Sequence, residues 1–341
     1  MQKNNLRFRS FRTGHTFPSK YLLAAALFMV SALSFLSLMT GRYPLSFGLL
    51  LSGDTQAVRV FVTLRVPRTG MALLGGFGLG IAGYVFQTIF RNPLASPDMI
   101  GVSSGASAGA AFGILFLSSG AFAGGLSVTA SAFAGGLLAV FLTLALGTLV
   151  PGKGSASMIL AGIAVHSLAQ TFLMILKLLA DPEKELASIE YWLMGSLGAV
   201  TLKRLPVSLI LGLGCVAGLC LLHRQLLLLS LEESESRMLG VPVEKLRFAV
   251  LLLATLLTAS IISNTGLISF IGLLAPHTAR LLSRDNRFPT LLLSGLWGSI
   301  LLLAADILAR SAGAGELPVS IFTSLLGAPF LIYLVVRSDH P

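Results

Sequence analysis

Long apolar stretches separated by short polar segments dominate this sequence. A helix needs about 20 apolar residues to cross the hydrocarbon core of a membrane. Ten stretches approach that length, at residues 21–39, 68–90, 98–118, 121–149, 156–180, 205–228, 247–264, 266–283, 288–310 and 317–336. The pattern predicts an all-α polytopic membrane protein of about ten transmembrane helices. Because ten is an even number, both termini are expected on the same side of the membrane.

The first 20 residues carry five basic side chains and precede the first apolar stretch. Signal peptides show the same order, but their apolar region is typically about 7–15 residues long and ends at a small-residue cleavage site. The stretch at 21–39 is longer, and no such site follows it. We therefore expect 1–20 to form a basic cytoplasmic N-terminus. Residues 21–341 are expected to form a single transmembrane domain that begins with an uncleaved span.

Composition and charge agree with a protein that is surrounded mostly by lipid. Hydrophobic residues make up 55% of the 341 residues and charged residues only 11%, whereas a soluble domain carries roughly 25% charged residues. With cytoplasmic termini, most of the 24 Lys and Arg residues fall in cytoplasmic segments, as the positive-inside rule requires. The net charge of +10 also favours contact with anionic lipid headgroups. No dense basic tract with interleaved aromatic residues occurs, so nucleic acid is not an expected partner.

Two polar segments are long enough to fold outside the membrane. Residues 181–204, DPEKELASIEYWLMGSLGAVTLKR, are expected on the periplasmic or extracellular side. Residues 229–247, LSLEESESRMLGVPVEKLR, are expected in the cytoplasm and contain four glutamates. A charged segment on the cytoplasmic side is a candidate contact for a soluble partner.

The stretch RNPLASPD, residues 91–98, interrupts the apolar pattern at the inner end of the second span. Pro93 and Pro97 each remove a backbone donor and block helix continuation, so a tight turn is predicted here. The following residues 103–111 are all Gly, Ser or Ala, which let helices approach closely in lipid. A simple packed hairpin explains the small residues but does not explain Asn92 and Asp98.

Several motif-like stretches carry no chemistry. GVSSG at 101–105 matches a hydrolase elbow but lacks the preceding strand that the elbow requires. VPGKGSAS at 150–157 lacks the hydroxyl residue that follows the lysine of a phosphate loop. Cys215 and Cys220 are five residues apart, which fits neither a metal site nor a redox pair. We expect no catalytic residue, no metal site and no cofactor bound by this chain.

Polar residues inside the predicted spans are few. His277 and Arg280 lie in GLLAPHTARLL, and Asp306 and Arg310 lie four residues apart on one helix face, where they can pair. Intramembrane charges usually face protein or a water-filled path. The sequence leaves open whether these residues are structural or functional. An ion-coupled secondary transporter would need intramembrane carboxylates, for which Asp306 is the one candidate.

Five stretches in order resemble the FecCD-type permeases, the membrane subunits of ABC importers for ferric siderophores, heme and cobalamin. They are RVPRTGMALLGGFGLGIAGYVFQTIFRNPLASPDMIGVSSGASAGA (65–110), WLMGSLG (192–198), LISFIGLLAPHTARLL (267–282), LLLAADILAR (301–310) and ELPVSIFTSLLGAPFLIYLV (316–335). The resemblance covers most of the chain beyond about residue 60. It implies a type II ABC importer permease fold with ten helices in a bacterial cytoplasmic membrane.

The resemblance also implies a function and partners. The chain is expected to move an iron chelate, a ferric siderophore first of all, by alternating access. Heme and cobalamin are the alternatives within the family, and a secondary transporter is the alternative outside it. The expected partners are two ATPase subunits that hold ATP and Mg²⁺, a second permease subunit in a homodimer or heterodimer, and a substrate-binding protein.

Three sets of site residues carry over from the family by position. The inner gate is expected at Asn92, Leu94, Ser155 and Ala156, where Ala156 replaces the usual hydroxyl residue. ATPase coupling is expected at Glu232, Glu233, Arg237, Leu239 and Gly240. Docking of the binding protein is expected at Arg65, Arg68 and Arg310, three arginines on the side where the positive-inside rule disfavours them.

Overall fold

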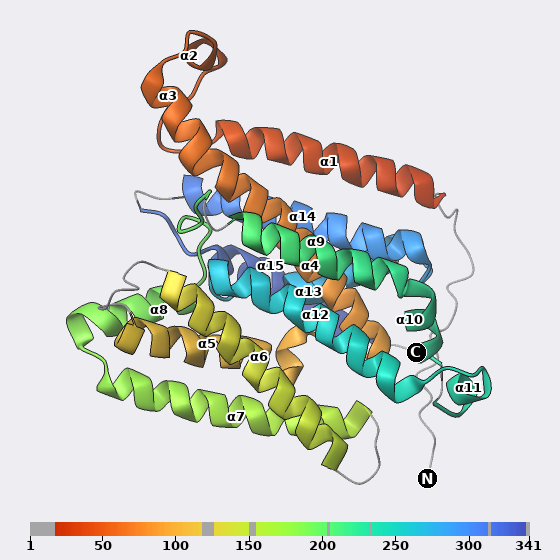
Figure 1. The fold of residues 1–341 in the computed structure, drawn as a ribbon. Coiled ribbons are helices and arrows are strands. Elements are labelled where there is room, and N and C mark those ends of the chain that lie inside the picture. Colours follow the sequence, from red (N-terminus) through yellow and green to blue (C-terminus); the bar gives the residue numbers. More distant parts are fainter. Residues whose placement is uncertain are drawn as a thin grey trace.

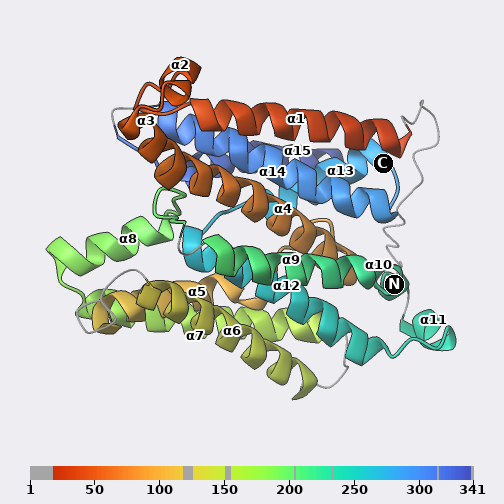
Figure 2. The same ribbon diagram turned by 45° about the horizontal axis from the view of Figure 1, so that its top comes forward.

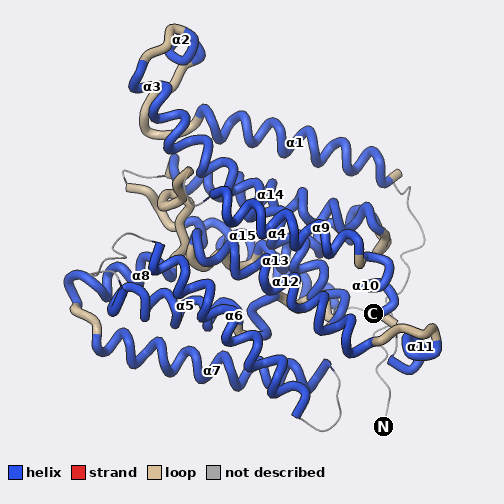
Figure 3. The backbone as a smooth tube through the Cα atoms, viewed as in Figure 1, coloured by secondary structure: helices blue, strands red, loops and turns tan. Residues whose placement is uncertain are grey.

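The computed structural model describes residues 18–117, 126–149, 155–202, 205–231, 233–312 and 315–338, and no strand occurs within these ranges. The long helices lie side by side, and most connecting loops lie at the two ends of the bundle (Figures 1 and 3). The helices are α1 (Ser19–Met39), α2 (Phe47–Leu51), α3 (Thr55–Val60), α4 (Val66–Ile89), α5 (Val102–Phe112), α6 (Leu126–Leu149), α7 (Ser155–Leu179), α8 (Ala187–Leu193), α9 (Leu205–Leu221), α10 (His223–Leu229), α11 (Glu233–Met238), α12 (Val243–Thr265), α13 (Ile271–Ser283), α14 (Phe288–Ser311) and α15 (Val319–Ser338). Shorter π or 3-10 segments are η1 (Phe61–Arg65), η2 (Pro97–Ile100), η3 (Gly113–Leu117) and η4 (Pro182–Leu186).

Every predicted span overlaps a helix, which confirms the all-α membrane architecture. By length and composition, six described helices can cross a membrane alone, and a seventh is formed if α9 and α10, bent by 64°, count together. The predicted spans at 98–118, 266–283 and 317–336 correspond to shorter apolar or mixed helices. In 266–283 the first five residues form a loop, and α13 has only 13 residues. At about 1.5 Å per residue such a helix is shorter than the hydrocarbon core.

The two polar segments singled out in the sequence lie at opposite ends of the bundle. Helix α11 and the start of α12, which belong to 229–247, lie at one end, and α8 of the 181–204 segment lies with α2 and α3 at the other (Figures 1 and 2). We call these the inner and outer ends, following the charge distribution along the chain. The start of α1 lies at the inner end (Figure 1).

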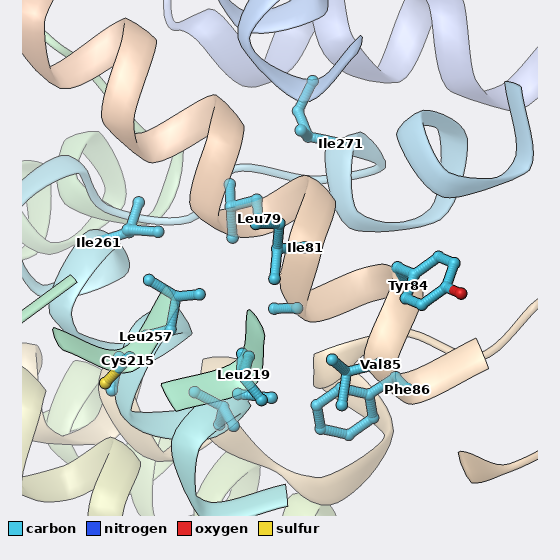
Figure 4. Close-up of a cluster of buried hydrophobic side chains, with 14 of the residues drawn as sticks. Leu79, Ile81, Tyr84, Val85, Phe86, Cys215, Leu219, Leu257, Ile261 and Ile271 are labelled. Carbon is cyan, nitrogen blue, oxygen red and sulfur yellow. The ribbon is translucent and has the colours of Figure 1, made fainter. Parts of the chain in front are cut away.

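Helix α4 is the centre of the fold and packs against α1, α9, α12, α13 and α14. Its buried side chains meet Leu219 of α9 and Leu257 of α12 in one apolar cluster (Figure 4). Its glycines allow close helix approach. A Cβ at Gly80 would lie 2.1 Å from the Ser294 carbonyl oxygen of α14, and one at Gly83 would lie 1.7 Å from the Gly272 carbonyl oxygen of α13.

The small-residue stretch after the inner turn packs as the sequence predicts. Gly105 and Gly109 of α5 face α6, where a Cβ on either would lie within 2.4 Å of a carbonyl oxygen, that of Gly135 or Ser131. Because packing and not hydrophobicity drives helix association in lipid, this close contact stabilises the α5–α6 pair.

Candidate functional site

A buried ionic cluster joins three helices at the outer end. Arg68 of α4 donates from Nε to Asp306 Oδ1 of α14 at 2.8 Å. Arg310 Nη2 lies 2.9 Å from Asp306 Oδ2, an ion pair whose angle does not make a hydrogen bond. The predicted pairing of Asp306 with Arg310 is therefore confirmed. Asp306 is fully buried and balances two arginines, so each guanidinium depends on the same carboxylate.

Arg310 also reaches the end of α1. Its Nη1 donates to the carbonyl oxygens of Ser37 and Thr40, both at 3.1 Å, and its Nη2 donates to Ser37 Oγ at 2.6 Å. These carbonyls belong to the last turn and C-cap of α1, where the helix leaves acceptors unpaired and a cation is favourable. Ser37 Oγ is also 2.8 Å from Thr69 Oγ1 of α4. Arg310 thus fastens α1 to α14 and α4.

The cluster extends to a second carboxylate that the sequence did not single out. Arg68 Nη1 donates to Oε1 and Oε2 of Glu316, both at 3.0 Å. The Glu316 side chain is 39% exposed, in contrast to the buried Asp306. Glu316 lies 248 positions from Arg68 and outside any helix, so no helical spacing connects the two in the sequence.

The three arginines expected to receive a binding protein are bonded within the chain. Arg65, Arg68 and Arg310 are 5%, 7% and 6% exposed. Arg65 donates from Nη2 to the Tyr43 carbonyl oxygen at 2.9 Å, and its guanidinium lies so close to Gly41 that a Cβ there would be 2.4 Å from Cζ. The three arginines therefore lie beneath the outer surface and bind other residues of this chain. Docking of a binding protein on them stays a prediction.

In the inner turn, Asn92 and Asp98, which a simple packed hairpin did not explain, each form a local hydrogen bond. Asn92 Oδ1 accepts from the Leu94 backbone N–H at 2.9 Å, which is the hydrogen bond of an Asx turn. Asp98 accepts from the Ser103 hydroxyl across the start of α5. Leu94 is 41% exposed beside this turn. Of the second expected gate element, Ser155 and Ala156 begin α7, and their side chains lie outside the described part of the structure.

Arg280 of α13 ties the inner end of α4 to the neighbouring loop. It donates to Thr88 Oγ1 and Asn286 Oδ1, both at 2.9 Å, and contacts Gln87 Oε1. Its guanidinium also lies 4.8 Å from the centre of the Tyr84 ring. These contacts give Arg280 a structural role in joining α13 to α4 and to the loop before α14. His277 meets the Phe330 ring edge-on at 5.4 Å, and no group of three or more metal-ligating side chains occurs among the described residues.

The segment expected to couple to an ATPase projects from the inner end (Figure 1). Leu239 is 61% exposed, and Gly240 adopts φ +76°, a left-handed conformation that glycine favours. Arg237 Nη2 lies 3.3 Å from Glu244 Oε1. Glu233 begins α11, but its side chain, like the whole of Glu232, lies outside the described residues.

A cavity of about 550 Å³ opens beneath α8 at the outer end. Its lining includes Tyr191 and Trp192 of α8, and Ser263 and Asn264 at the end of α12. Aromatic side chains together with a few polar groups are typical of sites for small organic molecules.

Comparison with known proteins decides the family, because residues 28–337 match the FecCD transport family. The chain belongs to the FecCD transport family. This FecCD permease is 36% identical over 327 residues to the hemin transport system permease protein HmuU of Yersinia pestis, covering 93% of this chain and 96% of that protein. It is 34% identical over 332 residues to the molybdate import system permease protein MolB of Haemophilus influenzae, covering 93% and 96%. It is 36% identical over 296 residues to the cobalamin import system permease protein BtuC of Halobacterium salinarum, covering 86% and 76%.

Solved structures agree with the family assignment. The FecCD permease matches an inward-facing conformation of a metal-chelate type ABC transporter with a TM-score of 0.83 and 33% identity, covering 94% of this chain and 100% of that chain. It also matches PsaBC of Streptococcus pneumoniae with a TM-score of 0.57 and 19% identity, which shows a shared fold. The chain is a multi-pass permease of the ABC importer class.

Proposed function

We propose that this permease imports an iron chelate, a ferric siderophore first of all, across a bacterial cytoplasmic membrane. The observation that carries the proposal is the family match over 28–337 together with the likeness to a metal-chelate type transporter. The relatives are named for hemin, molybdate and cobalamin, so heme and cobalamin remain the alternatives and molybdate joins them.

We propose that transport proceeds by alternating access driven by two separate ATPase subunits. The chain has no phosphate loop, and its exposed inner segment around Leu239 offers an apolar contact for a soluble partner. A second permease subunit and a substrate-binding protein complete the proposed assembly. The inner gate is proposed at Asn92 and Leu94, with Ser155 and Ala156 at the start of α7 as its second element.

The docking of the binding protein is proposed at the outer surface above the arginine cluster. Arg68 pairs with Asp306 and Glu316, and Arg310 pairs with Asp306. With Arg65, the three arginines exceed these two carboxylates by one positive charge. This excess of positive charge beneath the outer surface supports contact with an acidic partner surface, because complementary charge steers the encounter of two proteins.

Substrate identity is tested by uptake in a strain that lacks the chromosomal gene for this permease. Labelled ferric siderophores, heme, cobalamin and molybdate are offered separately, with and without the restored gene. Restoration of ferric siderophore uptake alone supports the proposal. Restoration of only one of the other substrates contradicts the siderophore assignment but not the importer class. Uptake that persists after the partner ATPase is inactivated contradicts the importer class and favours an ion-coupled transporter.

A further inference from the structure

Three connections that are far apart in the sequence meet at the outer end of the fold. We call them the outer junction: residues 195–200 before α9, 265–267 after α12 and 316–320 at the start of α15. The Ser196 backbone N–H donates to the Thr265 carbonyl oxygen at 2.7 Å, and the Val319 N–H donates to the Gly195 carbonyl oxygen at 3.1 Å. The Ser320 hydroxyl donates to the Leu267 carbonyl oxygen at 2.6 Å. The junction therefore links the α8–α9 connection to both other outer loops.

The interior of the outer junction is closed to solvent. Leu197 has no exposed surface, and Val200 and Val319 are 4% and 1% exposed. All three belong to the main apolar cluster that surrounds α4. Gly195 is held so tightly that a Cβ would lie 2.0 Å from the Leu267 carbonyl oxygen. Any opening of the outer end between these loops must move 195–200 off this apolar surface.

A single described ion pair connects the outer junction to the buried arginine cluster, that of Glu316 with Arg68. Gly198 lies directly beside it, because a Cβ there would be 2.8 Å from Glu316 Oε2. Arg68 thus has two unlike counter-ions. Asp306 is fully buried, whereas the Glu316 side chain is 39% exposed. Water can replace Glu316 on Arg68 at its exposed side, and Asp306, although it is shared with Arg310, still pairs with the Arg68 Nε. The pair with Glu316 can therefore separate while the Arg68 guanidinium keeps one buried counter-ion.

We infer that Glu316 is a positioning residue whose ion pair with Arg68 holds the outer junction closed and separates when the outer end opens during transport. The inference rests on the proposed function as an alternating-access permease. It assigns Asp306 a permanent structural role and Glu316 a releasable one.

The test measures how often the outer junction opens. Cys215 and Cys220 are replaced by Ala, and Leu197→Cys then supplies one buried reporter at the junction. The assembled transporter in right-side-out vesicles is labelled from outside with a membrane-impermeant maleimide. Glu316→Gln is expected to raise the labelling rate several-fold, because it removes the charge that holds Arg68. Glu316→Asp keeps the charge and is expected to restore most of the slow labelling.

Glu190→Gln is the matched control. It removes an ion pair with Lys177 of 2.8 Å between side chains that are 45% and 29% exposed, also near the outer end but outside the junction. Its labelling rate at Leu197→Cys is expected to equal that of the parent. An equal rate in Glu316→Gln and the parent would overturn the inference.

General loss of stability is separated from opening by a second reporter. Leu219→Cys lies in the core of α9, at a position with no exposed surface in the parent. It is labelled with a membrane-permeant maleimide in the same backgrounds. A rise at both positions in Glu316→Gln indicates general unfolding and contradicts the positioning role. Because labelling needs no substrate, this inference can fail while chelate uptake is intact, and chelate uptake can fail while the labelling result holds.

Discussion

At the residue scale, Asp306 is the buried carboxylate at the centre of the ionic cluster that joins the helices of the outer end. It is fully buried, and two buried guanidinium groups, those of Arg68 and Arg310, share its carboxylate. Removal of one partner from a buried ionic group leaves uncompensated charge and typically costs about 3–5 kcal/mol.

Asp306→Asn is therefore expected to lower the free energy of unfolding by about 3–5 kcal/mol and to reduce the yield of folded protein. The readout is thermal unfolding of the purified permease in detergent. Glu316→Gln is the comparison, since a partly exposed pair contributes only about 0–1 kcal/mol. Equal losses of unfolding free energy in the two variants would contradict a structural role for Asp306 and a separable ion pair for Glu316.

The sequence could predict only half of this cluster. Asp306 and Arg310 are four residues apart on one apolar helix, so helical geometry alone pairs them. Arg68 and Glu316 join them through tertiary packing of α4 against α14 and a loop, which no local spacing encodes. The same limit applies to Arg280, whose partners Gln87 and Thr88 lie on another helix.

At the element scale, backbone contacts between small residues decide how α4 is placed. Pro276 inside α13 has no N–H to donate to the Gly272 carbonyl oxygen four residues earlier. Gly83 of α4 packs against this same oxygen. A glycine is required there because the contacting atom is backbone and cannot rotate away.

Gly83→Ala is expected to destabilise the fold by about 1–3 kcal/mol or more, as overpacking of a tight core does. Gly214→Ala in α9 is the matched control, because no atom lies within 4 Å of its added Cβ. Gain of helix propensity should leave this control as stable as the parent or slightly more stable. Thermal unfolding of both variants checks the prediction, and similar midpoints for the two would argue against close α4–α13 contact.

A second prediction at this scale concerns the inner segment that contains α11. Leu239→Asp places a charge on an exposed apolar position and is expected to prevent an apolar contact with the ATPase subunits, with loss of uptake. Leu239→Met keeps the apolar character and should preserve both. Copurification of the ATPase and chelate uptake are measured together. Wild-type values for both in Leu239→Asp would show that the contact lies elsewhere.

Hydropathy predicted where helices occur better than where they begin. The predicted span 266–283 includes a loop in which Phe270 adopts φ +66°, and the helix starts only at Ile271. The loop is as apolar as the helix, so a sum of hydropathy cannot distinguish them. For the same reason, hydropathy predicted α9 and α10 as one span and did not predict the 64° bend between them.

At the scale of the whole molecule, different interactions hold the outer end and the inner end of the bundle together. The outer end is held by buried charges and by hydrogen bonds between loops that are distant in sequence. The inner end presents a proline turn whose shape depends on the local Asn92–Leu94 hydrogen bond and whose Leu94 side chain is 41% exposed. Opposite ends that differ in this way suit a protein that opens one side at a time.

The absence of a phosphate loop makes a direct prediction about energy supply. The purified permease alone is expected neither to bind nor to hydrolyse ATP, because the matching stretch 150–157 lacks the residue that would supply a magnesium-binding hydroxyl. Nucleotide binding by calorimetry and phosphate release are the measurements. The reconstituted complex with its ATPase subunits is the positive control, and tight binding by the permease alone would contradict the division of labour between subunits.

If alternating access moves the inner turn, its reactivity must depend on the nucleotide state of the ATPase partners. Leu94→Cys, in a background with Cys215 and Cys220 replaced by Ala, is labelled from the cytoplasmic side with and without ATP and vanadate. We expect at least a several-fold difference in labelling rate between the two states, because the proposed gate puts the exposed Leu94 side chain at an inner mouth that narrows and widens. Phe288→Cys is the control: Phe288 is 43% exposed at the start of α14, at the same inner end, and its ring meets His223 of α10 rather than the turn. A rate at Leu94→Cys that changes no more than the rate at Phe288→Cys would remove the gate assignment and leave Asn92 and Leu94 as parts of a static turn.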